Sequence, residues 1–368
     1  MKILLVGGAV RNLLLGRHVA DKDFLVSGST RKEFLSHFPQ AKEVGHHFPV
    51  FLVDGDEYSF PRADSLAKDL EARDFTINGL ALDESGKLYA HPLALADLHA
   101  RILRPASPSA FQADPIRVFR AARFLAELDD FSPSDELRAA MCDASAMGLL
   151  DSLSPERVGA ELTKAMSGSR PSRFLSFLQE TNCLKPWFHE FFGSDTIPAG
   201  PLPLHSTSVL GHTMEVMDRL APGGPLRVWM GMVHDLGKTL TSSLELPRHL
   251  GHDTAGEALA VALGTRLRLS NRFLRAGALA ARLHMKAGRY PELRPGTRVD
   301  LLTTLKFRPM IKDLFILCAA DHGQDYTAAA LTDLEAIRAV RLKPQDRDRG
   351  AISGRKLHQL QVEAIIRI

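Results

Sequence analysis

The stretch "VADKDFLV", Val19 to Val26, places two aspartates one residue apart directly before an apolar run that is typical of a buried strand. Carboxylates at the edge of a strand lose hydration energy unless water or a cation meets them. Residues i and i+2 of an extended backbone point to the same side, so the carboxylates of Asp21 and Asp23 are expected to converge. The stretch is therefore either a solvated turn or the edge of a cation site, and both interpretations stay open on these residues alone.

Residues 1–125 carry both strand and helix patterns. The run "KILLV" predicts a short strand, and "AVRNLLLG" after it predicts a helix that ends at Gly16. The apolar face of that helix is expected to hold Val10, Leu13 and Leu14. Further along, "PVFLVDGDEYSF" predicts a β-hairpin whose turn is Asp54-Gly55.

After Asp114 the strand signals fade and helical periodicity takes over. It runs through "DPIRVFRAARFLAEL", "SPERVGAELTKAM" and "RPSRFLSFLQET". Asp114-Pro115 and Ser154-Pro155 each suit an N-cap followed by proline at the first helical position. A Gly/Pro/Ser-rich interval at residues 192–208 predicts a domain boundary, and the tail "LKPQDRDRGAISGRK" predicts a polar loop before a last short helix.

Length and charge bound the class of protein. A chain of 368 residues is long for one core and favours two or three domains. A formal net charge of +3 is too small to indicate a polyanionic partner. The segment from Arg266 to Lys312 nevertheless holds twelve Lys and Arg residues against Glu292 and Asp300. A solvated helical surface explains such a segment, and an anionic partner such as nucleic acid is the sharper hypothesis.

The three cysteines, Cys142, Cys183 and Cys318, lie far apart without a CxxC pair. This spacing argues against a disulfide framework or a zinc knuckle and fits a reducing cytoplasm. The apolar N-terminal run is interrupted by Arg11 and lacks a small-residue cleavage site. No stretch reaches the roughly 18 apolar residues that span a bilayer. We therefore expect a soluble cytoplasmic protein without a membrane partner, and no feature of the sequence specifies an oligomeric state.

Several segments near the paired aspartates could bind a nucleotide. A strand that ends in Gly7-Gly8 and opens into a helix lets the backbone approach a phosphate, and Arg11 could add a bidentate contact. Most such glycine pairs are only tight turns. Two hard carboxylate ligands with open positions suit Mg²⁺, which keeps waters and recruits substrate phosphates.

Two downstream segments add polar groups to otherwise apolar surroundings. "EARDFTINGLA" contains Arg73, Asp74 and Asn78, which a capped and salt-bridged helix start would also explain. Asp114 and Arg117 are three residues apart and therefore neighbours on a helix. The carboxylate of Asp114 beside the guanidinium of Arg117 could form hydrogen bonds with the edge of a nucleotide base. Alternatively, Asp114 only caps the helix and forms an ion pair with Arg117.

The ordered set of these motifs resembles the class II tRNA nucleotidyltransferases, the CCA-adding enzymes. The set comprises Gly-Gly-x-Val-Arg, Asp-x-Asp, Arg-Asp-Phe-Thr-Ile-Asn and Asp-Pro-x-Arg-x-x-Arg-x-x-Arg-Phe, and the resemblance covers residues 1 to about 180. It implies an α+β fold in which a polymerase-β-type head, a mixed β-sheet with helices, spans residues 1–125. A mainly helical neck and body that binds tRNA would follow over residues 126–204.

The resemblance also assigns roles to individual residues. Asp21 and Asp23 would bind the catalytic Mg²⁺, and the 3′-hydroxyl of the tRNA would attack the α-phosphate of CTP or ATP. Gly8 and Arg11 would hold the triphosphate. The other implied contacts are Arg73, Asp74 and Asn78 near ribose and phosphates, Asp114 and Arg117 as a template for the base, and Arg120 and Arg123 as further phosphate contacts.

Three departures from the family pattern affect this expectation. Asn12 stands where the family usually has Asp, so Arg11 would lose an orienting carboxylate, and Ala113 replaces the usual Glu before Asp114. Only eleven residues separate Arg62 from Asp74. Full CCA-adding relatives carry a longer loop in this interval, whereas CC-adding relatives lack it. We therefore expect addition of two cytidines and poor or no addition of the terminal adenosine.

A second set of motifs lies beyond residue 205. A lone histidine on a helix is more often structural than a ligand, but the ordered series His, His-Asp and Asp in "HTMEVMDRL", "MVHDLGK" and "AADHGQD" resembles the HD phosphohydrolase superfamily. That resemblance implies an all-α domain over residues 205–325, a helical tail over 326–368, and a site for Mn²⁺, Ni²⁺ or a related ion that activates water. The implied ligands are His212, His234, Asp235 and Asp321, with His252 and His284 for a second metal or the phosphate.

Three rival interpretations remain on the sequence. A bacterial poly(A) polymerase shares the head motifs but is disfavoured by the HD residues and the short interval before Asp74. A hydrolase whose head only binds RNA is the alternative from a different class. A nucleotide-alarmone synthetase/hydrolase also pairs these chemistries, but usually with the hydrolase first in the chain.

Overall fold

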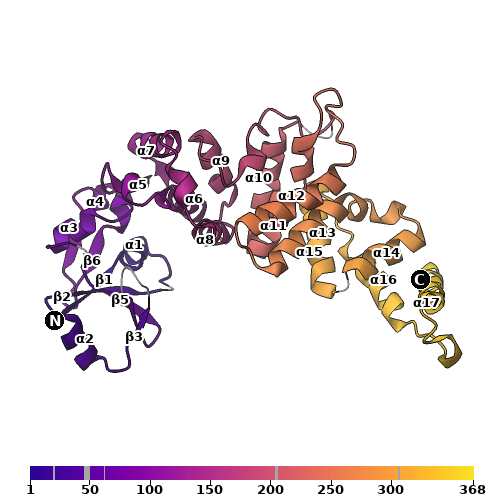
Figure 1. Cartoon of the computed structure of the whole chain (residues 1–368), viewed down its shortest axis with the longest axis horizontal. Helices are drawn as coiled ribbons and strands as arrows, with labels where there is room; N and C mark the ends of the chain where they lie inside the picture. The colour runs from indigo at the N-terminus through magenta and orange to yellow at the C-terminus, as the bar shows by residue number, and fades with distance from the viewer. Residues whose placement is uncertain (20, 45–49, 62, 204–205, 306) are drawn as a thin grey trace. The chain divides into compact units, whose positions relative to one another are not determined.

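The computed structural model describes residues 1–19, 21–44, 50–61, 63–203, 206–305 and 307–368 (Figure 1). The chain divides into two compact units, a sheet-containing unit and a helical unit. The first comprises Met1–Ala121, Leu128–Leu153 and Thr181–Cys183, and the second Ala122–Glu127, Ser154–Glu180 and Leu184–Ile368. A mixed sheet followed by many helices confirms the expected α+β class. The finer boundaries at residues 125, 204 and 325 stay predictions.

A seven-stranded mixed sheet forms the centre of the first unit, in the order β3-β4-β5-β2-β1-β6-β7. Strand β1 pairs antiparallel with β2 and β6, and β2 pairs parallel with β5. The strands are β1 Lys2–Val6, β2 Asp23–Ser27, β3 Lys42–Val44, β4 Val50–Val53, β5 Asp56–Ser59, β6 Leu80–Leu82 and β7 Leu88–Ala90.

Both faces of this sheet are buried at β2. Leu25 packs with β1 and with Leu70 of α3 (Leu66–Glu71), whereas Val26 packs with Phe34 of α2 (Arg31–His37). Successive side chains of a strand point to opposite faces, so one helix covers each face. This two-sided burial is the reason that an uninterrupted apolar run follows the paired aspartates.

The local predictions for the first unit hold with one correction. The hairpin β4–β5 turns at Asp54-Gly55, where both residues have positive φ (52° and 97°), as the turns of tight hairpins require. Helix α1 (Gly8–Leu14) is followed by Gly16 in the left-handed region. The expected apolar face of α1 is wrong, because Val10 is buried but Leu13 and Leu14 are about half exposed.

The remaining α-helices follow the sheet along the chain. They are α4 Ala94–Ala100, α5 Ala110–Ala113, α6 Arg117–Glu127, α7 Asp135–Ala146, α8 Pro155–Ala165, α9 Ser172–Glu180, α10 Val209–Leu220, α11 Pro225–Val233, α12 His252–Arg266, α13 Asn271–Ala287, α14 Pro295–Leu305, α15 Arg308–His322, α16 Thr327–Ala339 and α17 Ala351–Ile366. Ser154 is the N-cap of α8, as predicted. Helix α17 includes residues 351–356, which the sequence predicts as loop.

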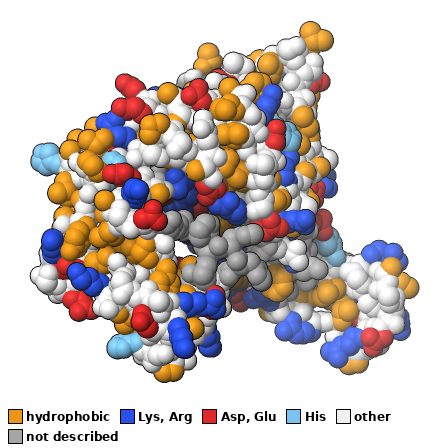
Figure 2. All heavy atoms as spheres, turned by 60° about the vertical axis from the view of Figure 1, so that its left-hand side comes forward, with side chains coloured by type: hydrophobic (Ala, Val, Ile, Leu, Met, Phe, Trp, Pro, Cys, Tyr) orange, Lys and Arg blue, Asp and Glu red, His pale blue; other side chains and the backbone are white. Residues whose placement is uncertain are grey.

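Three global expectations can be compared with the structure. The cysteines are free thiols, and two of the three are buried. No described helix is long and apolar enough to cross a membrane. On the face drawn in Figure 2, acidic and basic side chains lie interspersed, which accords with the small net charge.

Candidate functional site

The turn between β1 and α1 accepts only glycine at its first position. Gly7 has φ +66°, and a Cβ atom there would lie 2.9 Å from Nη1 of Arg73. The positive φ strains any residue that has a side chain, and a Cβ atom would also displace the Arg73 guanidinium. Arg73 therefore lies against the Gly7-Gly8 turn. Its Nη2 lies 3.5 Å from Oδ2 of Asp69, and its Nε is buried without a hydrogen-bond partner among the described residues.

Arg11 is buried and held by two asparagines. Its Nη1 donates to Oδ1 of Asn78 at 2.6 Å, and its Nε and Nη2 donate to Oδ1 of Asn12 at 3.2 Å and 3.0 Å. The amide oxygen of Asn12 thus orients the guanidinium from the position where the resemblance leads one to expect Asp. The departure removes a negative charge but leaves Arg11 with an orienting acceptor.

Asp74 joins Asn78 to α6. Its Oδ1 accepts hydrogen bonds from Nδ2 of Asn78 and from the Phe75 backbone, both at 2.9 Å, and its Oδ2 accepts from Nε of Arg120 at 2.9 Å. Burial acts to raise the pKa of Asp74, but the Arg120 guanidinium and these hydrogen bonds lower it to about 2. Arg11, Asn78, Asp74 and Arg120 therefore form one continuous hydrogen-bonded network.

Other predicted base- and phosphate-binding residues lie on or before α6. Arg117 donates to the backbone oxygens of Ala72 and Arg73 at 2.9 Å and 3.0 Å. Helix α6 begins at Arg117 rather than after Asp114, because the Arg117 amide bonds back only three residues, to Asp114, and so forms a tighter turn than an α-helix.

Arg123 has a different environment in the second unit. It is buried, and its guanidinium pairs with Glu161 at 2.6 Å and with Glu127 at 2.8 Å. These two carboxylates account for the position of Arg123 without a substrate, so its expected phosphate contact stays a prediction.

The paired aspartates are exposed at the N-terminal end of the central strand β2. Strand β2 begins at Asp23, and Asp21 lies before it, so the strand does not extend over both carboxylates. The sheet register pairs Asp23 with Val6, the last residue of β1, which brings it beside the Gly7 turn. On its other side Asp23 pairs with Glu57 of β5. The sequence analysis did not single out Glu57, since it follows a turn and its position beside Asp23 depends on the parallel pairing.

The short interval before Asp74 holds α3, which Ser65 caps through its side chain. Arg62, from which the interval is counted, lies outside the described residues.

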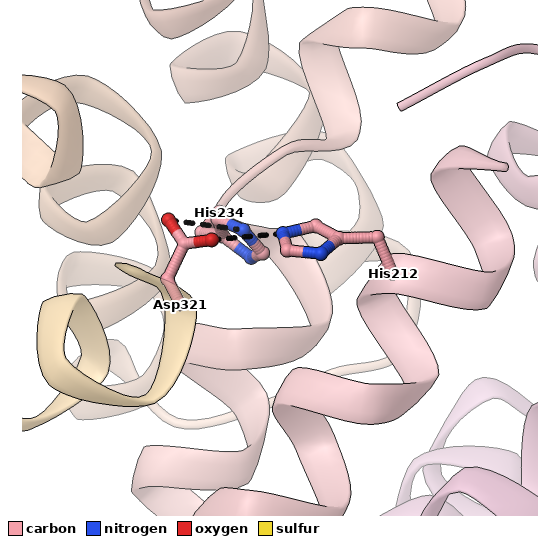
Figure 3. A group of neighbouring side chains, drawn as sticks. All are labelled: His212, His234 and Asp321. Carbon is pink, nitrogen blue, oxygen red and sulfur yellow. Dashed lines mark hydrogen bonds and ion pairs between the residues drawn. The ribbon is translucent and has the colours of Figure 1, made fainter. Parts of the chain in front are cut away.

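The second unit gathers the histidines and aspartates of the HD-like motifs at one place, and Figure 3 shows three of them pointing toward one another. His212 of α10, His234 at the end of α11 and Asp321 of α15 form one group, in which Nε2 of His212 lies 2.8 Å from Oδ1 of Asp321. Asp235, His252 of α12 and His284 of α13 form a second group. Within each group the ligand atoms all lie within 4.8 Å of one another. We call the six residues the His/Asp cluster.

The histidine rings of the cluster are held by backbone carbonyls. Nδ1 of His234 lies 2.8 Å from the Gly231 oxygen, Nδ1 of His252 lies 2.6 Å from the His249 oxygen, and Nδ1 of His284 lies 3.0 Å from the Ala280 oxygen. A carbonyl can only accept, so Nδ1 donates, and Nε2 is the ring nitrogen that faces the cluster.

The donor set of the cluster fits divalent metal ions. Nε2 of His234 is buried and makes no hydrogen bond among the described residues, and it lies 3.3 Å from Oδ2 of Asp235 and 3.8 Å from Oδ2 of Asp321, a spacing that a shared metal ion would also produce. Imidazole nitrogens and carboxylate oxygens, three in each group, suit Mn²⁺, Ni²⁺ or a related ion. Burial acts to lower the pKa of His234, but Asp235 and Asp321 raise it to about 9. The cluster thus favours a cationic centre, which a metal ion can supply in place of a proton.

Two residues outside the motif series complete this site. The ammonium of Lys238 lies 2.7 Å from Oδ2 of Asp235 and donates to the Ala199 oxygen at 2.8 Å, although its side chain is buried. Nε2 of His322 lies 3.1 Å from Oδ2 of Asp321. Neither Lys238 nor His322 was predicted from the sequence as part of the site. Their proximity in sequence to Asp235 and Asp321 was the available signal, but a neighbour in the chain points into a site only by virtue of local backbone geometry.

Comparison with known proteins places the chain in a family. The family model described as "Probable RNA and SrmB- binding site of polymerase A" matches residues 130–192. The multifunctional CCA protein of Xanthomonas axonopodis pv. citri is 38% identical over 354 residues, which cover 87% of this chain and 85% of the relative. That of Pseudomonas paraeruginosa is 35% identical over 406 residues, covering 99% and 98%.

Solved structures share the fold. The CCA-adding enzyme of Bacillus stearothermophilus in complex with CTP has a TM-score of 0.67 at 19% identity and covers 99% of this chain and 88% of its own. The Thermotoga maritima CCA-adding enzyme complexed with tRNA has a TM-score of 0.63 at 19% identity, covering 99% and 87%. The chain belongs to the family of class II CCA-adding tRNA nucleotidyltransferases, and the relatives it matches are multifunctional CCA proteins.

Proposed function

We propose that the sheet-containing unit adds nucleotides to the 3′ end of tRNA from CTP and ATP. The observation that carries this proposal is the network from Arg11 through Asn78 and Asp74 to Arg120, because it joins three motifs that are far apart in sequence beside the Gly7-Gly8 turn. Relatives of this chain are multifunctional CCA proteins, which supports the same activity.

In this proposal each element of the site has a separate task. The Gly7-Gly8 turn and the start of α1 receive the triphosphate, and Arg73, which lies against this turn, contacts it. The network holds Arg11 and Arg120 in place while the substrate binds. Asp114 and Arg117 read the base of the incoming nucleotide.

Asp21 and Asp23 would hold the Mg²⁺ ion. They offer exposed oxygen ligands at the strand end beside the phosphate-binding turn, which fits an ion that keeps part of its water shell. The ion would supply charge neutralisation at the α-phosphate and at the leaving pyrophosphate. Glu57 of β5 lies beside Asp23 and adds a third carboxylate near this end of β2.

The finer proposal is that this chain adds the two cytidines and adds the terminal adenosine poorly or not at all. The short interval before Asp74 supports it, since a longer flexible segment there is associated in the family with the change from CTP to ATP. Incubation with a tRNA that lacks its 3′ end, with CTP and ATP present, separates the outcomes on one gel. Efficient completion to CCA would sink the CC-adding proposal, and long A tails would instead indicate a poly(A) polymerase.

A second function is proposed for the helical unit, a metal-dependent phosphohydrolase. The convergence of His234, Asp235 and Asp321 with three further histidines in one buried cluster supports it. A metal ion bound there would supply an activated water for attack on a phosphoester. His212, His234 and Asp321 would hold one ion, and Asp235, His252 and His284 would hold a second ion or face the phosphate.

Hydrolysis of a 2′,3′-cyclic nucleotide in the presence of Mn²⁺ or Ni²⁺ tests this function. The wild-type chain is expected to hydrolyse it and to lose the activity with a chelator. Equal rates with and without the metal ion would contradict the proposed role of the cluster.

A further inference from the structure

A surface pocket of about 510 Å³ lies in the helical unit, built from residues outside the His/Asp cluster. It is lined by residues near the starts of three helices. The lining residues include Leu226 of α11, Arg272 and Arg275 of α13, and Phe307, Met310 and Asp313 at the beginning of α15.

The same three helices carry the pocket at one end and the His/Asp cluster at the other. Leu226 precedes His234 by eight residues, and Asp313 precedes Asp321 by eight. With a rise of 1.5 Å per residue, the two sites are separated by roughly 12 Å along the helix axes. None of the three helices has an acidic residue in its first turn, so their positive dipole ends add to the charge of the pocket.

The pocket retains positive charge that its surroundings do not neutralise. Arg272 and Arg275 are exposed and make no ion pair with a carboxylate of the described residues. The carboxylate in the pocket, Asp313, is already paired with Arg227 at 2.7 Å. By contrast, six of the eleven described basic residues between 266 and 312 pair with carboxylates. These are Arg266, Arg268, Arg282, Arg289, Arg298 and Arg308.

An aromatic ring is exposed beside these charges. Phe307 is 58% exposed, and the Arg275 guanidinium carbon lies 5.6 Å from the centroid of its ring. Leu226 and Met310 supply apolar surface in the same pocket. An open ring next to a guanidinium offers a stacking surface to a planar base, and such stacking tolerates any base.

We propose that this pocket binds an unstacked nucleotide of an RNA strand, with the base on Phe307 and the adjoining phosphates on Arg272 and Arg275. The inference rests on the proposed function in that the strand would belong to the tRNA substrate. Arg272 and Arg275 are three residues apart on one helix face and can therefore contact neighbouring phosphates. Basic side chains that contact the nucleic-acid backbone, together with an aromatic ring on which any base can stack, are typical of sites that bind single strands.

Binding of labelled single-stranded oligocytidine RNA and of tRNA lacking its 3′ end to the full chain tests the proposal. Phe307→Ala is expected to weaken both complexes roughly fivefold or more, because one stacked base is lost. Phe307→Tyr should keep the wild-type affinity. The double variant Arg272→Ala/Arg275→Ala should weaken binding and reduce the slope of log affinity against log salt by up to about 1.4, which is two phosphate contacts at about 0.7 each.

Arg289→Ala is the matched control, since Arg289 lies in the same basic segment but is exposed and paired with Glu292. It should bind RNA as the wild type does. Unchanged RNA affinity in both pocket variants would overturn the proposal. Loss of binding to free CMP, with RNA binding unchanged, would overturn the assignment to an RNA strand.

Nucleotide incorporation at saturating tRNA is measured separately on the wild type. If the wild type incorporates no cytidine but Phe307→Ala still weakens oligocytidine binding, the proposed function fails and the pocket proposal stands. The reverse result, with normal incorporation and unchanged RNA affinity of the variants, overturns only the pocket.

Discussion

The strand end at Asp21 and Asp23 and the His/Asp cluster both contain carboxylates that we propose bind metal ions, yet their environments are opposite. Asp21 and Asp23 are exposed, whereas the side chains of Asp235 and Asp321 are only 3% and 2% exposed. Exposed carboxylates keep their hydration until a substrate and its ion arrive. Buried carboxylates need a cationic partner, and the ammonium of Lys238 supplies one to Asp235.

This difference indicates two ways of preparing a phosphate reaction. In the first unit the rigid part is the network behind the aspartates, and the ligands themselves face solvent. In the second unit the proposed ligands are themselves held in place, because carbonyl oxygens orient the histidine rings. We therefore expect substitutions of Asp21 or Asp23 to lower the rate of nucleotide addition. Substitutions in the His/Asp cluster should lower metal content as well as the rate of hydrolysis.

The largest effect is expected from Asp21→Ala. Loss of a ligand to the catalytic ion should lower cytidine incorporation roughly 10³-fold or more, because stabilisation by the ion is worth several kcal/mol in the transition state. Incorporation of labelled CTP into tRNA is the measurement. Asp54→Asn, at the exposed hairpin turn, is the control and should keep wild-type activity; a comparable loss there would point to a general electrostatic effect.

The next largest effect is expected from His234→Ala in the cluster. Removal of a ligand should lower metal affinity by more than the roughly 10–100-fold that loss of an outer partner costs. Metal content after dialysis, measured by mass spectrometry, reports it. Full retention of metal by the variant would show that His234 is not a ligand.

Lys238→Met tests the support of the cluster rather than its ligands. Lys238 contacts Asp235 but presents no lone pair while charged. The variant should lose roughly 10–100-fold in metal affinity. Isothermal titration with Mn²⁺ measures the change, and a loss as complete as that of His234→Ala would contradict a purely orienting role.

Asp74 gives the first unit a pH dependence. Its pKa is lowered to about 2 in the folded chain, so its contribution to stability is present above the ordinary pKa of Asp near 4 and is lost as the pH falls toward 2. The contribution amounts to about 2 kcal/mol. Hydrogen exchange of residues 70–80 should lose protection between pH 4 and pH 2 in the wild type and change less in Asp74→Asn. If protection depended on pH in the same way in the wild type and in Asp74→Asn, the ion pair of Asp74 with Arg120 would be contradicted.

The smallest effect is expected from Asn12→Asp, which restores the carboxylate common in the family. The Asn12 amide oxygen already orients Arg11, so the charged acceptor should change kcat/KM for CTP by about fivefold or less. Steady-state kinetics measure the change. An increase far beyond that range would show that the amide does not substitute for the carboxylate.

The residue types and their order predicted much of the fold and of both sites. The hairpin turn at Asp54-Gly55 and the helix start at Ser154-Pro155 follow from local backbone preferences and agree with the structure. The side chains of Leu13 and Leu14 do not, because whether an apolar helix position is buried depends on what packs against it. The sequence singled out all six cluster residues, and the structure brings them together. Asp235 lies between the two groups, since its carboxylate is 3.3 Å from Nε2 of His234 and 3.5 Å and 3.4 Å from Nε2 of His252 and His284.

Contacts between distant segments were beyond sequence reasoning. The hydrogen bond from Arg11 to Asn78 joins residues 67 positions apart, and the pairing of Asp23 with Glu57 depends on the order of strands in the sheet. Neither has a local signal, since both depend on tertiary packing rather than on spacing along the chain.

The central claim is that one chain carries two independent phosphate-chemistry sites. Cytidine incorporation and metal-dependent hydrolysis of a 2′,3′-cyclic nucleotide, both measured on Asp21→Ala and on His234→Ala, test it most directly. We predict that Asp21→Ala abolishes incorporation and keeps hydrolysis, and that His234→Ala keeps incorporation and abolishes hydrolysis. Equal loss of both activities in either variant would contradict the claim.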